Sequence, residues 1–251
     1  DPEGSLRRFS RIAGSLGGKA IFYQSLHENP WLLEMTADLA AWSEYLTDIL
    51  VANPGLFDEV VDALRIGQTK TCEHMQAELG RLATGGEIAD TLRAYRAGEI
   101  LRLGVRDLFH AAPLEQTQAE LTDLATAILR IHLDHTRRAL AGRRGQARTE
   151  GGLPIGFAVL AVGKFGGREL NYGSDLDVLF FYDEEGAAGD GLPAGPYFTE
   201  LAQDLSRAMG TPSSLGSLYT LDARLRPSGS KGPLASSLAA FERYWKEGGL
   251  A

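Results

Sequence analysis

The spacing of apolar residues changes near residue 150, and this change limits the possible folds more than any other feature of the sequence. Before it, apolar side chains recur at every third or fourth position, as in Leu101, Val105 and Leu108, which is typical of amphipathic helices. After it, short apolar runs with glycine or proline nearby are typical of strands. These runs cover residues 155–162, 177–182 and 218–225. The chain is therefore expected to fold as an α+β protein.

We expect a helical domain over residues 1–150 that ends in a basic connector. Its longest amphipathic helix is predicted over residues 113–138. Two Asn-Pro pairs, at 29–30 and 53–54, each predict the start of a helix. Asparagine accepts hydrogen bonds from free backbone N–H groups there, and proline has no N–H group to leave unpaired.

A second domain is expected over residues 151–251, incomplete at its C-terminal end. Helices are predicted at about 197–209 and 238–246, so the elements follow the order β-β-α-β-α. This order, with strands that are mostly apolar, indicates an α/β or α+β domain with a largely buried sheet.

The charge balance and the single cysteine exclude several classes of protein. With 25 Lys and Arg against 33 Asp and Glu, the net charge is -8, whereas proteins that bind nucleic acid usually carry a basic surplus. Cys72 alone cannot build a disulfide framework and fits a reducing compartment. No apolar run approaches the ~20 residues of a membrane-spanning helix. We therefore expect a cytoplasmic protein that binds neither nucleic acid nor a membrane.

A basic stretch follows the predicted long helix. It contains five arginines and no acidic residue: Arg137, Arg138, Arg143, Arg144 and Arg148. One interpretation is a solvated connector after a helix C-terminus, where cations suit the helix dipole. The other is a contact to a phosphate or to an acidic partner, and the sequence leaves both open.

The most informative segment runs from Gly163 to Asp177 and reads GKFGGRELNYGSDLD. Its adjacent glycines, Gly166 and Gly167, follow a predicted strand, and glycine lets backbone N–H groups approach phosphate oxygens without obstruction by a Cβ atom. Asp175 and Asp177 begin the next strand and are expected on one face of it. Carboxylates this close repel each other unless a cation lies between them, so the pair predicts a site for a hard cation such as Mg²⁺. Solvated acids at the start of a strand are the alternative.

The third predicted strand, over residues 218–226, adds another acid and two cations. Asp222, Arg224 and Arg226 alternate with apolar residues, which places them on one face of that strand. A third carboxylate can complete a metal site, and arginines bind phosphate through bidentate hydrogen bonds. A surface ladder of Asp and Arg is the alternative interpretation.

A Gly-Gly turn, an Asp-x-Asp strand and a later lone Asp together resemble the nucleotidyltransferase superfamily of DNA polymerase β. The full wording of residues 163–177, with LDARLRPSG at 221–229, is similar to glutamine synthetase adenylyltransferase. The helical part agrees, since residues 43–54 and 93–108 resemble the family's region before each catalytic core. The resemblance covers nearly the whole chain, which is expected to be a minor part of such an enzyme.

The resemblance implies roles for particular residues and a fold like that of DNA polymerase β, with a mixed sheet, for the second domain. The catalytic acids, which would bind two Mg²⁺ ions, are Asp175, Asp177 and Asp222. The contacts to the phosphates of ATP would be Gly166, Gly167, Ser174, Arg224 and Arg226. Gly173 departs from the family, in which a serine is expected.

The resemblance also implies an activity and partners. Enzymes of this family carry two similar halves: one transfers AMP from ATP to a tyrosine hydroxyl of glutamine synthetase, and the other removes it by phosphorolysis to give ADP. Ser228 and residues 236–241 resemble the adenylylating half, so adenylyl transfer is the first expectation. Adenylyl removal is the second, and a catalytically inactive fragment that binds a partner is the third. The expected partners are glutamine synthetase and, in the full-length enzyme, a PII-type nitrogen-signalling protein.

Overall fold

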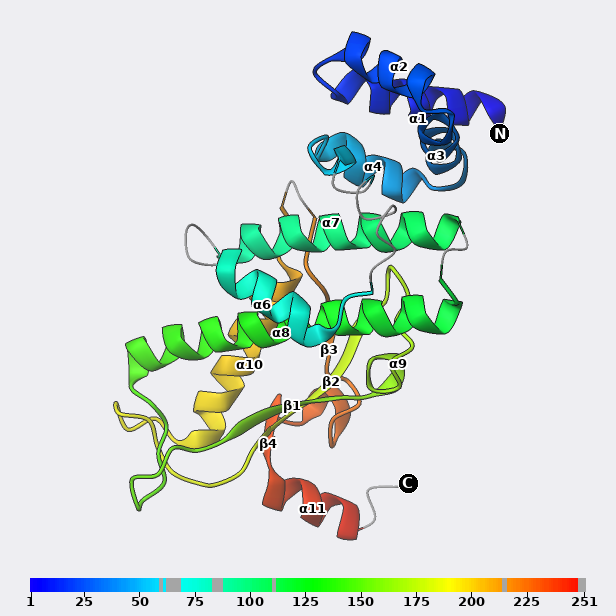
Figure 1. Cartoon of the computed structure of the whole chain (residues 1–251). Helices are drawn as coiled ribbons and strands as arrows, with labels where there is room; N and C mark the ends of the chain where they lie inside the picture. Colours follow the sequence, from blue (N-terminus) through cyan, green and yellow to red (C-terminus); the bar gives the residue numbers. More distant parts are fainter. Residues whose placement is uncertain (59–60, 62–68, 83–87, 110–111, 214–215, 248–251) are drawn as a thin grey trace.

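The computed structural model describes residues 1–58, 61, 69–82, 88–109, 112–213 and 216–247. N-terminal helices, a central pair of long helices and a small sheet follow one another along an elongated molecule (Figure 1). The predicted α+β class is confirmed. Among the described residues, no helix is both long enough and apolar enough to cross a membrane.

The N-terminal end of the molecule is built from helices. They are α1 (Pro2–Ser15), α2 (Lys19–Glu28), α3 (Pro30–Trp42) and α4 (Glu44–Ala52). The helix start predicted at Pro30 is confirmed, but the Asn29 side chain caps the other helix: its Nδ2 donates to the carbonyl oxygen of Ser25 in α2 at 3.0 Å. Asn53 ends α4 in the same way, with Nδ2 2.9 Å from the carbonyl oxygen of Ile49. The helix predicted after the second pair lies largely outside the described residues.

Two long helices form the centre, α7 (Ile88–Leu108) and α8 (Leu114–Arg144), with α6 (Cys72–Leu82) packed against both. Leu101 on α7 and Leu124 and Ile128 on α8 are completely buried, as the apolar spacing predicts. A glycine brings α4 close to α7, because a Cβ atom on Gly104 would lie 2.5 Å from Cδ1 of Leu46. The helical region therefore packs as one unit from α4 to α8.

The basic stretch is mostly helical, which corrects the prediction of a basic connector. Helix α8 continues past residue 138 to Arg144, so only Arg148 lies beyond it. Arg143 pairs with Asp204 at 2.6 Å, and Arg144 pairs with Glu200 at 2.7 Å. Both acids lie on α10 (Ala194–Gly210), which packs against α8. The division into domains near residue 150 stays a prediction, since these ion pairs cross it.

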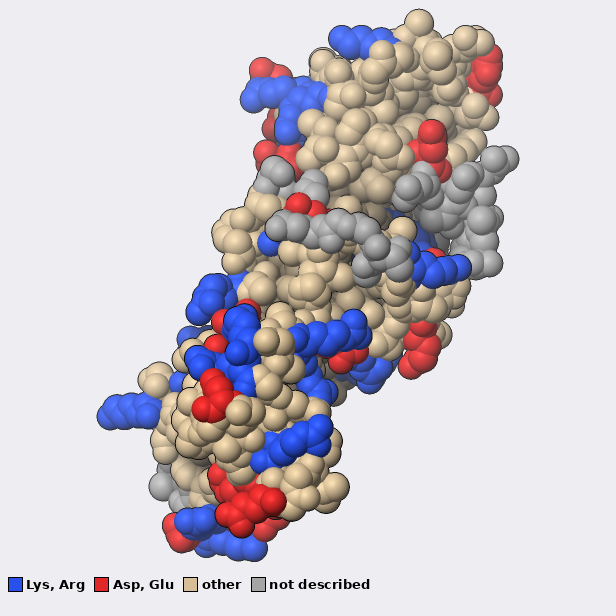
Figure 2. Space-filling model, turned by 90° about the vertical axis from the view of Figure 1, so that its left-hand side faces the viewer, with Lys and Arg blue, Asp and Glu red and all other residues tan. Residues whose placement is uncertain are grey.

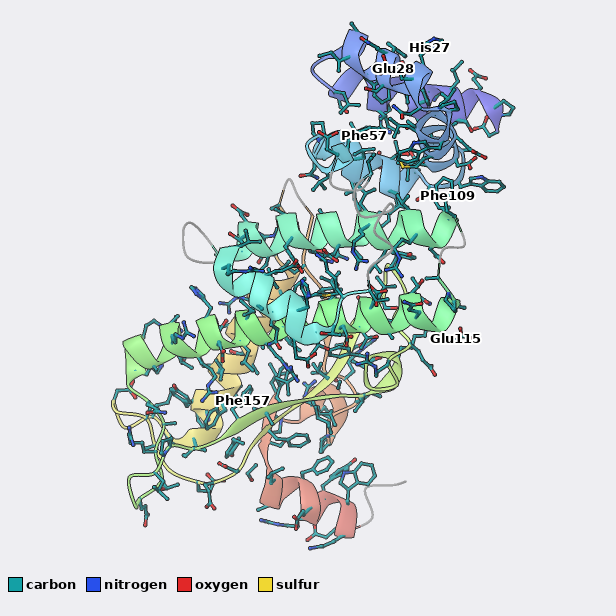
Figure 3. The ribbon with its side chains drawn as sticks, in the orientation of Figure 1. His27, Glu28, Phe57, Phe109, Glu115 and Phe157 are labelled. Carbon is teal, nitrogen blue, oxygen red and sulfur yellow. The ribbon has the colours of Figure 1, made fainter. Side chains whose placement is uncertain are left out.

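The sheet is small and mixed. Its strands are β1 (Phe157–Ala161), β2 (Leu176–Tyr182), β3 (Leu221–Asp222) and β4 (Ala235–Ser237). Strand β2 pairs with all three others, antiparallel with β1 and parallel with β3 and β4. Phe157 of β1 lies between the sheet and α10 (Figure 3), with its ring centroid 5.3 Å from that of Phe198. The other face meets α11 (Leu238–Lys246), where the ring centroids of Phe181 and Phe241 are 4.7 Å apart.

The third strand is much shorter than predicted, and a fourth was missed. Only Leu221 and Asp222 pair with β2, whereas the backbone N–H groups of Leu218 and Tyr219 donate to the carbonyl oxygen of Met209. Beyond Asp222 the chain turns through η1 (Gly229–Lys231) before β4 begins. Strand β4 consists of one alanine and two serines, so no apolar run in the sequence predicts it. These residues are buried because the strand pairs with β2.

Candidate functional site

A single helical turn, α9 (Gly163–Gly166), connects β1 to the glycine-rich loop before β2. Gly163 has a φ of 55°, and a Cβ atom on it would lie 2.5 Å from Oδ2 of Asp177. Only glycine therefore allows the start of α9 to pass so close to this carboxylate. This role of Gly163 was not predicted from the sequence, although a glycine directly after an apolar strand is the signal that could have revealed it.

The predicted phosphate contacts Gly166 and Gly167 close the turn of α9. Their backbone N–H groups donate to the carbonyl oxygens of Val162 and Gly163, both at 2.9 Å. A Cβ atom on Gly166 would lie 2.6 Å from the carbonyl oxygen of Ala161, so close backbone packing accounts for this glycine. Contact of either residue with phosphate stays a prediction.

Helices α7 and α8 hold the loop between α9 and β2 in place. Arg168, whose φ is 61°, pairs with Asp123 of α8 at 2.8 Å. The hydroxyl of Tyr172 donates to Oδ2 of Asp107 on α7 at 3.3 Å. Burial, followed by the nearby Asp107 carboxylate, raises the pKa of Tyr172, so its hydroxyl keeps the proton that it donates. The two long central helices, α7 and α8, thus hold both halves of the loop in place.

The next residues place the first two acids. Ser174 accepts a hydrogen bond from the backbone N–H of Asn171 at 3.0 Å, which closes the loop just before β2. Asp175 is exposed and precedes β2, whereas Asp177 lies on the strand and is partly buried. In the described part of the chain, neither carboxylate has a hydrogen-bond or ion-pair partner. Two neighbouring negative charges are therefore left without direct compensation.

The third acid lies beside the second. Asp177 of β2 and Asp222 of β3 are register partners on adjacent parallel strands, as the sequence predicts for these two segments. Asp222 accepts from Nε of Arg224 at 2.8 Å and from the Arg224 backbone N–H at 2.9 Å. These hydrogen bonds lower the pKa of Asp222.

Arg224 does not lie on a strand face, which corrects the predicted ladder. The strand ends at Asp222, and the Arg224 side chain folds back onto that carboxylate. Its hydrogen bonds with Asp222 raise the pKa of Arg224 most, and the charges of Asp175 and Asp177 raise it further. The guanidinium of Arg224 thus forms an ion pair with Asp222 and interacts electrostatically with Asp175 and Asp177, without an ion pair to either among the described residues.

Arg226 is also away from the predicted position, because it holds its own loop together. Its Nη1 donates to the carbonyl oxygen of Ala223 at 2.8 Å, and Nη2 and Nε reach those of Ser230 and Gly232 at 3.3 Å. Ser228, at the tip of this loop, has a left-handed φ of 61°. Contact of Arg226 with phosphate stays a prediction.

The three acids suit a hard cation in their chemistry. Carboxylate oxygens are the ligands that Mg²⁺ prefers, and Arg224 shows that positive charge is favourable among them. Within the described ranges, however, no three Asp, Glu, His or Cys side chains converge closely enough to hold a metal ion. A metal bound by both Asp177 and Asp222 must therefore displace Arg224 from Asp222.

A cavity of about 330 Å³ opens beside these acids. It is lined by Tyr45 of α4, Arg96 of α7 and two segments of the sheet domain, residues 172–175 and 217–220. The cavity thus contains both Ser174 and Asp175 of the predicted site. It is formed jointly by the helical region and the glycine-rich loop.

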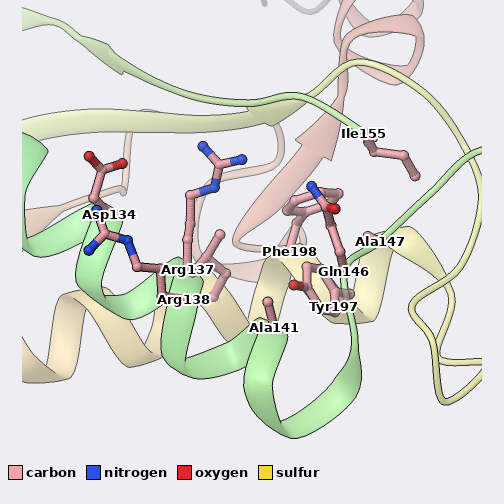
Figure 4. Close-up of a pocket in the computed structure, with 10 residues that line it drawn as sticks. Asp134, Arg137, Arg138, Ala141, Gln146, Ala147, Ile155, Tyr197 and Phe198 are labelled. Atoms are coloured by element: carbon pink, nitrogen blue, oxygen red, sulfur yellow. The ribbon is translucent and has the colours of Figure 1, made fainter. Parts of the chain in front are cut away.

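A second pocket, of about 270 Å³, lies between α8 and α10. Figure 4 shows it with Arg137 and Arg138 on α8 and Tyr197 and Phe198 on α10. In the part of the chain that the structure describes, these two arginines have no ion pair, unlike Arg143 and Arg144. Figure 2 shows the face of the molecule at which the C-terminal end of α8 lies. Lys and Arg gather over the lower half of that face. A contact to an acidic partner stays open for this pair.

The fold and the site define an α+β protein whose acidic centre is built on a mixed sheet beneath a pair of long helices. The sequence of this chain matches the family described as glutamate-ammonia ligase adenylyltransferase over residues 33–250. The chain belongs to that family, so the resemblance predicted from the glycine-rich segment is confirmed.

Relatives of this chain have names that agree with this family. Those from Methylococcus capsulatus, Thioalkalivibrio sulfidiphilus and Rhizobium meliloti are 34%, 33% and 33% identical to this chain, over 97%, 97% and 94% of its length. Each is named bifunctional glutamine synthetase adenylyltransferase/adenylyl-removing enzyme. The aligned part is 27%, 27% and 24% of the relatives, so the chain spans about a quarter of their length.

Proposed function

We propose that this chain carries the acidic centre for adenylyl transfer from ATP to a tyrosine hydroxyl of glutamine synthetase. The observation that supports it most is the pairing of Asp177 with Asp222 on β2 and β3, with Asp175 directly before β2. Family membership and the names of the relatives point to the same chemistry.

The proposed cofactor is Mg²⁺, as two ions held by Asp175, Asp177 and Asp222. Bound there, it supplies positive charge that neutralises phosphate oxygens and the leaving pyrophosphate. The chain's own residues prepare that place: Gly163 leaves room for the Asp177 carboxylate, and the loop anchored through Tyr172 sets Asp175 at the start of β2. Arg224, released from Asp222, would turn toward a phosphate oxygen, for which its guanidinium is well suited.

Adenylyl transfer is the first assignment and adenylyl removal the second. Position 228 supports adenylyl transfer, because the resemblance leads us to expect a bulky residue there in the adenylyl-removing half. The backbone of Ser228 has a φ of 61°, and a small side chain fits this left-handed turn with less crowding than a bulky one. Removal by phosphorolysis would use the same acids, with orthophosphate instead of the tyrosine hydroxyl as the nucleophile: it would attack the phosphorus of AMP-tyrosine, the bond to the tyrosine oxygen would break, and ADP would form. A catalytically inactive module that binds a partner is less well supported, because its acids would have no reason to remain unpaired at Asp175 and Asp177.

The test of the acidic centre measures binding of ATP to this chain by titration calorimetry, with and without Mg²⁺. Asp177→Asn should weaken Mg²⁺-dependent ATP binding by at least about tenfold, because a neutral amide replaces one of three anionic ligands. Asp134→Asn, at an exposed acid on α8, is the matched control and should bind as the unchanged chain does. Equal affinity in Asp177→Asn and the unchanged chain would contradict the proposed centre.

A second measurement separates the two halves of the activity. In an enzyme of the relatives' length that contains this chain, Asp175→Asn should abolish transfer of labelled AMP from ATP to glutamine synthetase. Phosphate-dependent removal of AMP should survive. The reverse pattern, with transfer spared and removal lost, would assign this chain to adenylyl removal.

A further inference from the structure

Helix α7 carries four arginines, and one of them differs from the rest. Arg93, Arg102 and Arg106 each form an ion pair with a carboxylate at 2.8–2.9 Å. Arg96 has no carboxylate partner among the residues that the structure describes. Its guanidinium lies over the ring of Tyr219, 4.6 Å from the ring centroid. One face of this cation is therefore stacked on an aromatic ring, while its charge is not neutralised.

Two buried polar atoms at this place have no hydrogen-bond partner among the residues that the structure describes. They are Nε of Arg96 and the hydroxyl oxygen of Tyr219, whose side chain is only 7% exposed. Burial opposes the charge of Arg96, but the phenols of Tyr219 and Tyr45 outweigh it and raise the pKa of Arg96. The cation thus stays charged. Buried donors without partners are costly, so their presence beside a cavity points to a ligand that would accept from them.

The chemistry of the cavity selects the class of ligand. Its lining supplies the Arg96 cation and the hydroxyls of Tyr219, Ser174 and Thr220, and its volume of about 330 Å³ exceeds that of a phosphate group several times. Asp175 is the single carboxylate of that lining and lies where the cavity meets the acidic centre. A donor-rich cavity with one buried cation is suited to phosphate oxygens.

We propose that this cavity binds the phosphate chain of the nucleotide, and that Arg96, delivered by the helical region, is the residue that neutralises it. The inference rests on the proposed function and deepens it, because it adds a phosphate contact to the acids of the sheet. It also gives the helical region a direct part in the site. The negative charge of Asp175 and Asp177 would repel a polyphosphate, and the Arg96 cation in the lining of the same cavity offsets that repulsion.

The test uses inorganic pyrophosphate, in buffer without Mg²⁺, as the probe of this chain in titration calorimetry. Arg96→Met keeps an unbranched side chain over Tyr219 but removes the charge. It should weaken pyrophosphate binding by at least about tenfold, the size of effect expected for hydrogen bonds to a charged group. Arg7→Met is the matched control, since it removes an equal charge from an exposed position on α1 that does not line the cavity, and it should bind pyrophosphate unchanged. Adenosine serves as the second probe, and its binding should not depend on Arg96.

Several results would overturn the inference. They are unchanged pyrophosphate binding in Arg96→Met, an equal loss of pyrophosphate and adenosine binding, or no pyrophosphate binding by the unchanged chain. Should Arg96→Met fail to fold, Tyr219→Phe provides the same test, because it removes only the unpartnered hydroxyl and should weaken pyrophosphate binding severalfold without lowering the melting temperature. The two proposals fail separately. Mg²⁺-dependent ATP binding that survives in Asp177→Asn contradicts the acidic centre, whereas the Arg96 measurements contain no Mg²⁺.

Discussion

Two clusters of charge lie on neighbouring parts of this molecule and are built in opposite ways. Between α7 and α8, Glu120 accepts from Arg102 at 2.9 Å, from Arg106 at 2.8 Å and from the backbone N–H of Lys70 at 3.1 Å. At the acidic centre, Asp175 has no such partner among the described residues. Both clusters contain carboxylates and arginines. Among the described residues only the first is balanced by ion pairs within the protein, and this difference supports the proposal that the second binds a ligand.

The balanced cluster supports the unbalanced one. Glu99 extends the network by accepting from Lys70 at 2.7 Å and from Arg102 at 2.8 Å. Next to it on the same two helices, Asp107 and Asp123 bind the loop that precedes β2. The helical region thus holds the loop before β2 in place through Asp107 and Asp123, and it contributes the charge of Arg96, which has no carboxylate partner among the described residues.

The comparison predicts the largest loss of stability at Glu120. Glu120→Gln should lower the free energy of unfolding by about 3 kcal/mol, because two buried arginines lose their shared carboxylate partner. Urea unfolding at neutral pH measures it. Glu3→Gln is the control, since Glu3 and Arg7 form an exposed pair at 3.8 Å and the expected change is below about 0.5 kcal/mol. A loss at Glu120 as small as that of the control would remove the distinction between the two clusters.

A pH-dependent effect, no larger than the loss expected at Glu120, is expected at His132. This side chain on α8 is 3% exposed, and within the described part of the chain neither of its ring nitrogens has a hydrogen-bond partner. Burial first, and then the charges of His135 and Arg93, lower the pKa of His132 from 6.5 to about 4. Between these values the unfolded chain binds a proton that the folded chain does not. The free energy of unfolding is therefore unaffected by His132 above about pH 6.5. It decreases as the pH falls toward 4, by up to about 3 kcal/mol.

Urea unfolding at pH 7.5, 6 and 5 measures this effect. His132→Leu should remove most of the decrease between pH 6.5 and 5, whereas His135→Gln, at an exposed position, should retain most of it, because burial is the larger cause of the lowered pKa. An equal pH dependence in the unchanged chain and in His132→Leu would mean that other groups cause it.

Much of the fold was predictable because its signals are local. The apolar spacing located α8 and α10, and α11 begins and ends at the predicted residues 238 and 246. The strand around Val178 and Phe180 was equally clear from its apolar run. Strand β4 was missed because its serines are buried only through parallel pairing with β2, a contact that no local pattern records.

The candidate site divides in the same way. The neighbourhood of Asp177 and Asp222 was predictable because each lies on its own recognisable segment. The positions of Arg224 and Arg226 were predicted wrongly, because alternation assumes an extended strand and the chain turns after Asp222. Arg96 could not be found at all, since its place beside Asp175 depends on how α7 packs on the loop before β2.

The smallest change in stability is expected at the acidic centre itself. Asp175→Asn removes no hydrogen bond to any residue that the structure describes and relieves repulsion with Asp177, so the free energy of unfolding without Mg²⁺ should stay within about 0.5 kcal/mol or rise. Added Mg²⁺ should then raise the melting temperature of the unchanged chain more than that of Asp175→Asn, because a ligand stabilises the state that binds it. Thermal melts with and without Mg²⁺ measure both differences. A large loss of stability without Mg²⁺ would show that Asp175 has a structural role, as Glu120 does. The two clusters would then no longer differ in this respect.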